Sequence, residues 1–212
     1  MSILNSTKIP YNVSYKLAQA YALIIAFILF ILSYIFGRDT LFLWFNANLG
    51  PFADTFFSYF TYLAEGWILI PYLILVVGIF KKDVPFIIIN FITSTLLTQI
   101  PKQLIWPSVN RPIASGIDIS KIHVVTGVDV HSFNSFPSGH TATAFSLFLI
   151  TVYLFPNKKV LLAGGLYAII CGYSRIYLGQ HFPLDIAGGI IAALLSVALS
   201  IQIRKKLFKK PF

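Results

Sequence analysis

The sequence predicts an all-α polytopic membrane protein with six transmembrane helices. The chain has 212 residues, of which 57% are hydrophobic and only 11% are charged. A soluble domain usually carries about a quarter charged residues, so this chain is strongly depleted in charge. Its mean hydropathy is +0.80, and its apolar residues gather in long runs. Such runs are typical of membrane-spanning helices of about 20 residues each.

The boundaries of the expected helices follow from the apolar runs and the short polar connections between them. No internal repeat and no low-complexity linker divides the chain, so we expect residues 1–212 to form one membrane-embedded domain. The six expected spans cover residues 17–36, 60–80, 84–103, 139–155, 160–179 and 184–203.

The first two spans need separate arguments. The run at 17–36 is longer than the apolar core of a signal peptide, about 7 to 15 residues, and no small-residue cleavage pattern follows it. We therefore expect a retained helix. The second span must extend back through "FFSYFTYLAEG", because "WILIPYLILVVGIF" alone is too short, and we expect Pro71 to kink it. Alternatively, residues 50–63 form an aromatic helix that lies in the membrane interface.

The net charge of +9 is concentrated beside the ends of the apolar runs. This placement is typical of juxtamembrane charge and disfavours nucleic-acid binding. The expected cytoplasmic side collects Lys8, Lys16, Lys81, Lys82, Lys158, Lys159, Arg204, Lys205, Lys206, Lys209 and Lys210. The opposite side holds Arg38, Lys102, Arg111, Lys121 and Arg175. The positive-inside rule therefore predicts that both termini are cytoplasmic.

Three polar clusters fall on the predicted outer side: "KQLIWPSVNRP", "FPSGHTA" and "SRIYLGQHFPLD". Clusters at equal membrane depth can converge in a helix bundle. A serine cap followed by glycine opens a helix whose first N–H groups bind anions, and nearby lysine and arginine side chains suit a phosphate group. The predicted phosphate-binding residues are Lys102, Arg111, Ser138, Gly139 and Arg175.

Two histidines stand beside this expected phosphate. Asp185, four residues after His181, can accept a hydrogen bond from Nδ1–H of that ring, which orients the ring and stabilises its cation. Nε2 of His181 is then free to attack phosphorus, and His140 can protonate the departing oxygen. The sequence thus predicts a phosphoryl-transfer site with the catalytic residues His181, His140 and Asp185.

These segments resemble the three signature motifs of the type 2 phosphatidic acid phosphatase superfamily. That pattern is Lys followed by Arg-Pro, then Pro-Ser-Gly-His, then Ser-Arg, five residues, His, three residues and Asp. The second and third motifs match in full, whereas eight residues separate Lys102 from Arg111, where the family usually has six. Lys121 is the alternative lysine. The resemblance covers roughly residues 102–185 and implies a phosphatase without a metal or other cofactor, acting through a phosphohistidine at His181.

The long connection 104–137 is expected to cover the site. It contains His123 and His131, which form an alternative metal site together with Asp129. Aromatic residues between 44 and 67 predict an interfacial belt, with binding of acyl or prenyl chains as the alternative role.

The sequence therefore predicts an integral membrane phosphatase that hydrolyses a phosphate monoester or pyrophosphate of an envelope lipid. The expected substrates are lipid A, undecaprenyl pyrophosphate, phosphatidylglycerol phosphate and phosphatidate. The expected location is the bacterial inner membrane, with the site facing the periplasm or exterior.

Two rival interpretations remain open. One is a transporter that binds phosphate or a lipid phosphate without hydrolysis; transporters usually bind near the bilayer midplane and carry repeats, which this sequence does not indicate. The other is a vanadate-dependent oxidase, which the family resemblance also implies and which the six spans disfavour. The sequence predicts no oligomeric state.

Overall fold

The computed structural model describes residues 11–79 and 83–207, and helices are the only regular secondary structure within these ranges. The main helices are α1 (Tyr11–Phe36), α2 (Arg38–Phe45), α3 (Pro51–Phe60), α4 (Leu69–Ile79), α5 (Val84–Ile100), α6 (Gly139–Leu154), α7 (Lys158–Tyr177) and α8 (Pro183–Leu207). Short helical turns are η2 (Thr61–Ala64), η3 (Gly66–Ile68), η5 (Pro101–Ile105), η6 (Pro112–Ala114) and η7 (Ile119–Lys121). The all-α fold class is confirmed.

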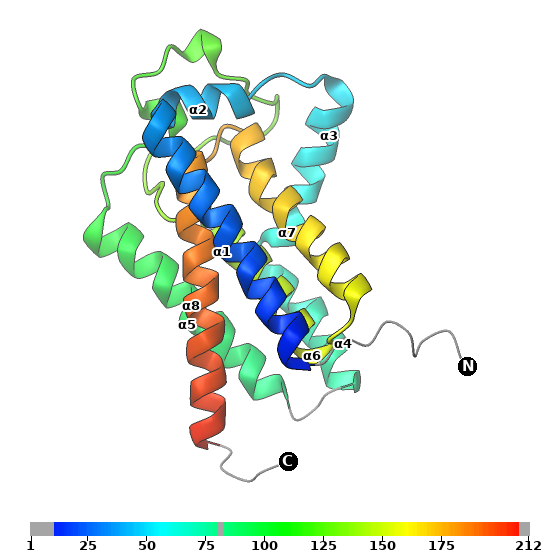
Figure 1. Cartoon of the computed structure of the whole chain (residues 1–212). Helices are drawn as coiled ribbons and strands as arrows, with labels where there is room; N and C mark the ends of the chain where they lie inside the picture. The colour runs from blue at the N-terminus through cyan, green and yellow to red at the C-terminus, as the bar shows by residue number, and fades with distance from the viewer. Residues whose placement is uncertain (1–10, 80–82, 208–212) are drawn as a thin grey trace.

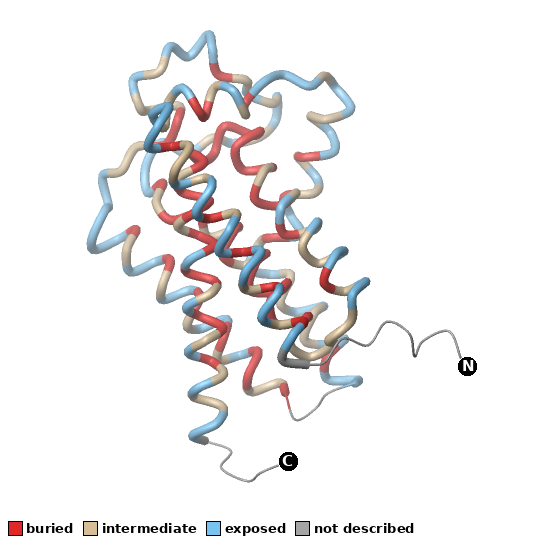
Figure 2. Tube along the Cα trace, in the orientation of Figure 1, coloured by how far each residue is buried: buried red, intermediate tan, exposed pale blue. Residues whose placement is uncertain are grey.

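Helix α6 forms the centre of the bundle, with α1, α5, α7 and α8 packed against it (Figure 1). Nearly all of its residues between Thr141 and Val152 are buried. Large apolar side chains are instead exposed on outward faces of the surrounding helices, for example Phe27 of α1 at 65% and Ile74 of α4 at 70%. Figure 2 shows this division of buried and exposed faces along α1. Such an apolar exterior is suited to acyl chains rather than water.

The number of membrane spans differs in detail from the prediction. Within the described residues, four helical segments are long and apolar enough to cross a membrane: Val13–Phe36, Val84–Ile105, Lys158–Tyr177 and Pro183–Lys206. The segments Pro51–Ala64 and Gly66–Ile79 qualify as a fifth span if taken together. Helix α6, at the remaining predicted position, is apolar but has only 16 residues. Because its neighbours surround it, α6 meets mostly protein instead of lipid.

The second predicted span is broken, and the break does not lie at Pro71. The segments Pro51–Ala64 and Gly66–Ile79 meet at 59°, and Glu65 between them has an extended backbone with φ −75° and ψ 157°. Pro71 lies in the first turn of α4, where a missing N–H removes no helical hydrogen bond. The expected kink at Pro71 is therefore wrong, because the helix has already ended and restarted before it.

The two ends of the bundle carry different features. Helix α1 begins, α8 ends and α6 turns into α7 at one end, the lower end in Figure 1. Helix α2, the start of α3 and the long connection between α5 and α6 lie at the other end. The predicted cytoplasmic residues Lys16, Lys158, Lys159, Arg204, Lys205 and Lys206 belong to helix segments near the lower end. Lys8, Lys81, Lys82, Lys209 and Lys210 lie outside the described residues.

Candidate active site

A cavity of about 350 Å³ lies where α5, α6 and α7 meet the long connection. Its lining includes most of the predicted site, contributed by segments far apart in the sequence. The predicted residues that line it are Lys102, Arg111, Gly139, His140, Arg175 and His181. The predicted convergence of the three polar clusters therefore occurs in the structure.

Lys102 and Arg111 reach this cavity despite the eight residues between them. Helix α5 continues into η5, a π-helical turn in which Trp106 N donates to the carbonyl oxygen of Pro101 at 2.8 Å. A π turn holds an extra residue compared with an α turn, so it accommodates part of the added length. Lys102 is buried within η5, whereas the alternative Lys121 is exposed.

The guanidinium of Arg111 is fixed by the surrounding backbone. Its Nε donates to the carbonyl oxygen of Phe133 at 2.9 Å. Its Nη1 donates to both oxygens of Gln180, the carbonyl at 3.1 Å and the side-chain Oε1 at 3.0 Å. The amide of Gln180 in turn donates to the carbonyl oxygen of Asp129 at 2.7 Å. Arg111 therefore joins the long connection to the third motif.

The end of α7 explains why Arg175 and His181 face the same cavity. Gly179 has a φ of +69°, a left-handed conformation that suits glycine and lets the chain turn back. Gln180 N and His181 N then both donate to the carbonyl oxygen of Arg175, at 2.8 and 3.1 Å. The five-residue spacing of the motif thus corresponds to one helix end folded onto itself.

Asp185 lies behind His181 rather than in the cavity wall. Its Oδ2 is 3.3 Å from Nδ1 of His181 and also accepts hydrogen bonds from the Ser135 hydroxyl at 2.5 Å and from Phe182 N at 2.9 Å. Both His181 and Asp185 are almost fully buried. Because two other donors hold the carboxylate in place, it can fix the orientation of the imidazole through Nδ1. Nε2 of His181 takes no part in this contact.

The electrostatic environment keeps His181 neutral. Burial lowers the pKa of His181 well below its ordinary value of 6.5, and nearby arginine and lysine charges lower it further. A neutral imidazole has the lone pair that a nucleophile needs.

The cations of this site have no carboxylate partners. Lys102, Arg111 and Arg175 are 8%, 8% and 7% exposed, and no ion pair in the described part of the chain involves them. The Nη1 of Arg175 donates to the Thr61 hydroxyl at 2.6 Å, whereas its buried Nε has no partner among the described residues. Asp185 and Glu65 interact with these cations electrostatically without forming an ion pair with any of them. Buried cations that lack a close ion-pair partner are costly, so this arrangement favours an anionic ligand.

The second motif opens α6. The hydroxyl of Ser138 caps the helix by accepting hydrogen bonds from Thr141 N at 3.4 Å and Thr141 Oγ1 at 2.9 Å. Ser138 is fully buried and does not line the cavity, whereas Gly139 and His140 do. The first N–H groups of a helix have no intrahelical acceptor. Phosphate binding by the Ser138 side chain stays a prediction.

This constellation has the chemistry of phosphoryl transfer, and comparison with known proteins gives the family. The family model described as the PAP2 superfamily matches residues 67–209, which is most of the chain. The chain belongs to the PAP2 superfamily.

Individual PAP2 relatives cover much of the chain. The crystal structure of Aquifex aeolicus LpxE matches with a TM-score of 0.65 and 32% identity, over 76% of this chain and 93% of that one. The lipid A 4'-phosphatase of Bacteroides thetaiotaomicron is 29% identical over 71% of this chain and 69% of its own. A transmembrane PAP2-type phosphatidylglycerolphosphate phosphatase from Bacillus subtilis shares the fold, with a TM-score of 0.65 at 24% identity, over 94% of this chain and 98% of that one.

Several residues at the site lie outside the PAP2 motifs, and sequence reasoning missed them. Thr61 contacts Arg175, and Glu65 lies near His140; both precede the matched range, which begins at residue 67. Glu65 could have been found as an acid inside an otherwise apolar run, near the end of the bundle that was predicted to face outward. Ser135, which holds Asp185, carried no recognisable signal.

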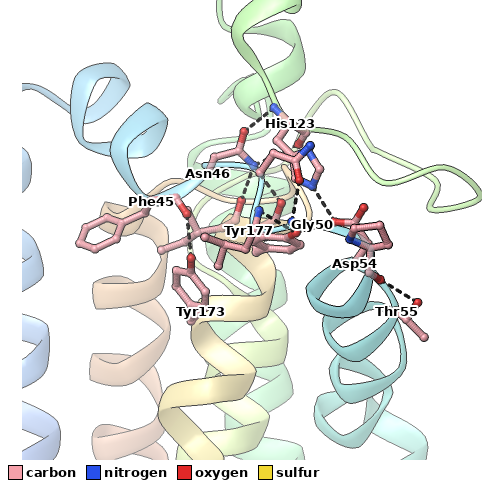
Figure 3. A network of polar contacts seen from close by, with 12 residues as sticks. Phe45, Asn46, Gly50, Asp54, Thr55, His123, Tyr173 and Tyr177 are labelled. Carbon is pink, nitrogen blue, oxygen red and sulfur yellow. Dashed lines mark hydrogen bonds and ion pairs between the residues drawn. The ribbon is translucent and has the colours of Figure 1, made fainter.

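A network of polar contacts braces the last turns of α7, where the third PAP2 motif begins (Figure 3). His123 Nε2 lies 2.8 Å from Oδ1 of Asp54, which also accepts a hydrogen bond from the Tyr177 hydroxyl. The Asn46 amide donates to the carbonyl oxygens of His123, Ile176 and Tyr177, at 3.1, 3.0 and 2.8 Å. The long connection and α3 are thereby attached to the last turn of α7.

The two histidines of the long connection lie in different surroundings. His123 contacts Asp54, whereas His131 lines the cavity. Asp129 uses its backbone carbonyl to accept from Gln180. Within the described residues, the structure does not bring His123, His131 and Asp129 together as a metal-binding group.

Proposed function

We propose that this chain is an integral membrane phosphatase that hydrolyses a phosphate monoester or pyrophosphate of an envelope lipid. The observation that supports this most directly is the set of buried, unpaired cations around a neutral His181. An anion with a reactive phosphorus atom fits both features. The PAP2 relatives with phosphatase names support hydrolysis over a transporter that only binds its ligand.

In the first chemical step, Nε2 of His181 attacks phosphorus as the bond from phosphorus to the lipid oxygen breaks. His140 donates a proton to that oxygen, so the lipid leaves as an alcohol or, from a pyrophosphate, as a protonated phosphate. Asp185 stabilises the charge that develops on the His181 ring.

In the second step, water attacks the phosphohistidine. His140 accepts a proton from the water, the bond between phosphorus and Nε2 breaks, and inorganic phosphate leaves. In both steps the charge on the phosphoryl oxygens is stabilised by Lys102, Arg111 and Arg175. We propose that the helix N-terminus at Ser138 and Gly139 contributes backbone donors, and that neither step uses a metal.

We propose that the whole of residues 1–212 forms one domain in the bacterial inner membrane, with cytoplasmic termini. The basic helix ends on one side of the bundle support this orientation. The cavity at the opposite end then faces the periplasm or exterior, where headgroups of envelope lipids lie.

The proposal is tested by measuring phosphate release from lipid A, undecaprenyl pyrophosphate, phosphatidylglycerol phosphate and phosphatidate in detergent with EDTA. The His181→Ala protein, checked for an unchanged elution volume and unfolding temperature, is the matched control. We expect release from one or more of these lipids that survives EDTA and is lost in His181→Ala. No release from any lipid by the wild-type protein would contradict the proposed function.

A further inference from the structure

The break in the second span places an acidic residue beside the catalytic histidine of α6. Glu65 is the extended residue between η2 and η3. The segment before the break is anchored to α7 at two points: the Tyr167 hydroxyl donates to the carbonyl oxygen of Leu63 at 2.5 Å, and Arg175 donates to the Thr61 hydroxyl at 2.6 Å. The position of Glu65 is therefore set by two contacts with the helix that carries the third PAP2 motif.

The carboxylate of Glu65 faces His140. Its Oε1 lies 3.8 Å from Nε2 of His140, and its Oε2 accepts a hydrogen bond from the Trp67 indole Nε1 at 3.0 Å. The residues on either side, Ala64 and Gly66, line the cavity together with His140. A movement of less than about 1 Å would bring these two atoms within hydrogen-bond distance, and catalytic contacts are often long before substrate binds.

Glu65 differs in charge from most other groups around His140. Lys102, Arg111, Arg175 and His131 line the cavity with His140, as does His181, which is paired with Asp185. Positive neighbours oppose a proton on the His140 ring, whereas the proposed reaction needs that proton for the leaving oxygen. A carboxylate opposite Nε2 favours the protonated ring and holds its orientation, which leaves Nδ1 for the substrate.

We propose that Glu65 is a positioning residue that acts through His140, by orienting its ring and stabilising its protonated form during proton transfer to the leaving group. This inference rests on the proposed function. It concerns only the step that breaks the bond between phosphorus and the lipid oxygen, so its effect depends on how strongly the leaving oxygen needs a proton.

The test compares two substrates whose leaving oxygens differ in how strongly they need a proton. One is the lipid phosphate identified in the panel above, with an alcohol or phosphate leaving group. The other is p-nitrophenyl phosphate, whose leaving group departs without a proton. We measure kcat/KM, because it reports the transfer of phosphorus to His181 and not the later hydrolysis. For Glu65→Gln we expect a loss of at least tenfold on the lipid and less than threefold on the aryl ester. The double variant Glu65→Gln/His140→Ala should be no slower than His140→Ala.

Two further variants separate positioning from folding or simple charge effects. Trp67→Phe removes the donor to Oε2 and should give a smaller loss with the same preference for the lipid substrate. Asp118→Asn, an exposed acid-to-amide change in the long connection, should leave both values unchanged.

The outcomes are distinguishable. Equal losses on both substrates, additive losses in the double variant, or an unchanged lipid kcat/KM in Glu65→Gln would each overturn the role of Glu65. A wild-type protein that hydrolyses neither substrate would overturn the proposed function itself, and the role of Glu65 with it.

Discussion

At the scale of single residues, the account depends on how Asp185 controls His181. Its Oδ2 contacts Nδ1 of His181 at 3.3 Å while two other donors hold it in place. The carboxylate therefore selects the ring orientation and tautomer, and it compensates the charge that appears when Nε2 bonds to phosphorus.

Replacing Asp185 with asparagine should preserve the fold and remove this control. We expect kcat to fall by about 10⁴-fold, the size seen when the aspartate of a serine triad becomes asparagine. Ser135→Ala, which removes one donor to the same carboxylate, should cause a smaller loss. Steady-state phosphate release measures both, and a loss below tenfold for Asp185→Asn would remove its orienting role.

The charges around His181 predict a specific pH dependence. Because burial and nearby cations lower the pKa of His181, the ring stays neutral as the pH falls through 6.5 and is protonated only well below it. The acid limb of kcat/KM should therefore lie below pH 6.5. Removing a nearby cation makes protonation of the His181 ring easier. Lys102→Met should therefore move the acid limb of kcat/KM to higher pH.

The matched control for that change is Lys121→Met, because Lys121 is the other lysine considered for the first motif and is exposed. Its acid limb should coincide with that of the wild-type protein. A shift in Lys121→Met but not in Lys102→Met would reassign the motif lysine.

At the scale of elements, the site depends on how closely α8 approaches the start of α6. A Cβ added to Gly189 would lie 2.5 Å from the carbonyl oxygen of Ser138, a backbone atom. In the same contact Ser138 N donates to the carbonyl oxygen of Asp185 at 3.0 Å. The absence of a side chain at Gly189 thus sets the distance between the second and third motifs.

Gly189→Ala should separate these two helices. We expect the free energy of unfolding to fall by about 1–3 kcal/mol, as in other overpacked interiors, together with a loss of activity. Gly78→Ala in α4 is the control, because its Cβ would meet open space and alanine favours helices by about 1 kcal/mol. Thermal unfolding in detergent compares them, and a Gly189→Ala protein as stable and active as wild type would contradict this packing.

The sequence predicted most helices within a few residues, because long apolar runs and the polar segments between them have direct physical meaning in a bilayer. It did not predict the break at Glu65. Pro71 was a plausible kink, but a proline near a helix start is compatible with an unbroken helix, and the break is fixed by contacts with Arg175 and Tyr167. The π turn at Lys102 likewise depends on tertiary packing.

At the scale of the whole molecule, the sequence predicted which end carries the site because its polar clusters share one membrane depth. The motif residues followed from their spacing and the family resemblance. Thr61, Glu65 and Ser135 did not, because their proximity to the motifs arises only when α3, η2 and the long connection fold over the ends of α6 and α7.

The predicted orientation can be checked with single cysteines in a Cys171→Ser background. Cys171 is buried and is the single cysteine of the sequence. With serine in its place, the introduced cysteine is the only thiol that can react. A cysteine at Asp118, in the long connection, should react with a membrane-impermeant maleimide in intact cells. A cysteine at Lys158, between α6 and α7, should react only after the cells are permeabilised. The reverse pattern would contradict cytoplasmic termini.

The proposed mechanism depends on transfer of the phosphoryl group to Nε2 of His181 before water releases it. The most direct measurement is to trap this phosphohistidine intermediate. The purified protein is mixed with lipid carrying a radiolabelled phosphate, quenched in alkali within one turnover, and digested for peptide mapping. We predict acid-labile label on the peptide that contains His181, and none in His181→Ala. Turnover that proceeds without protein-bound phosphate, or label that persists in His181→Ala, would contradict the account.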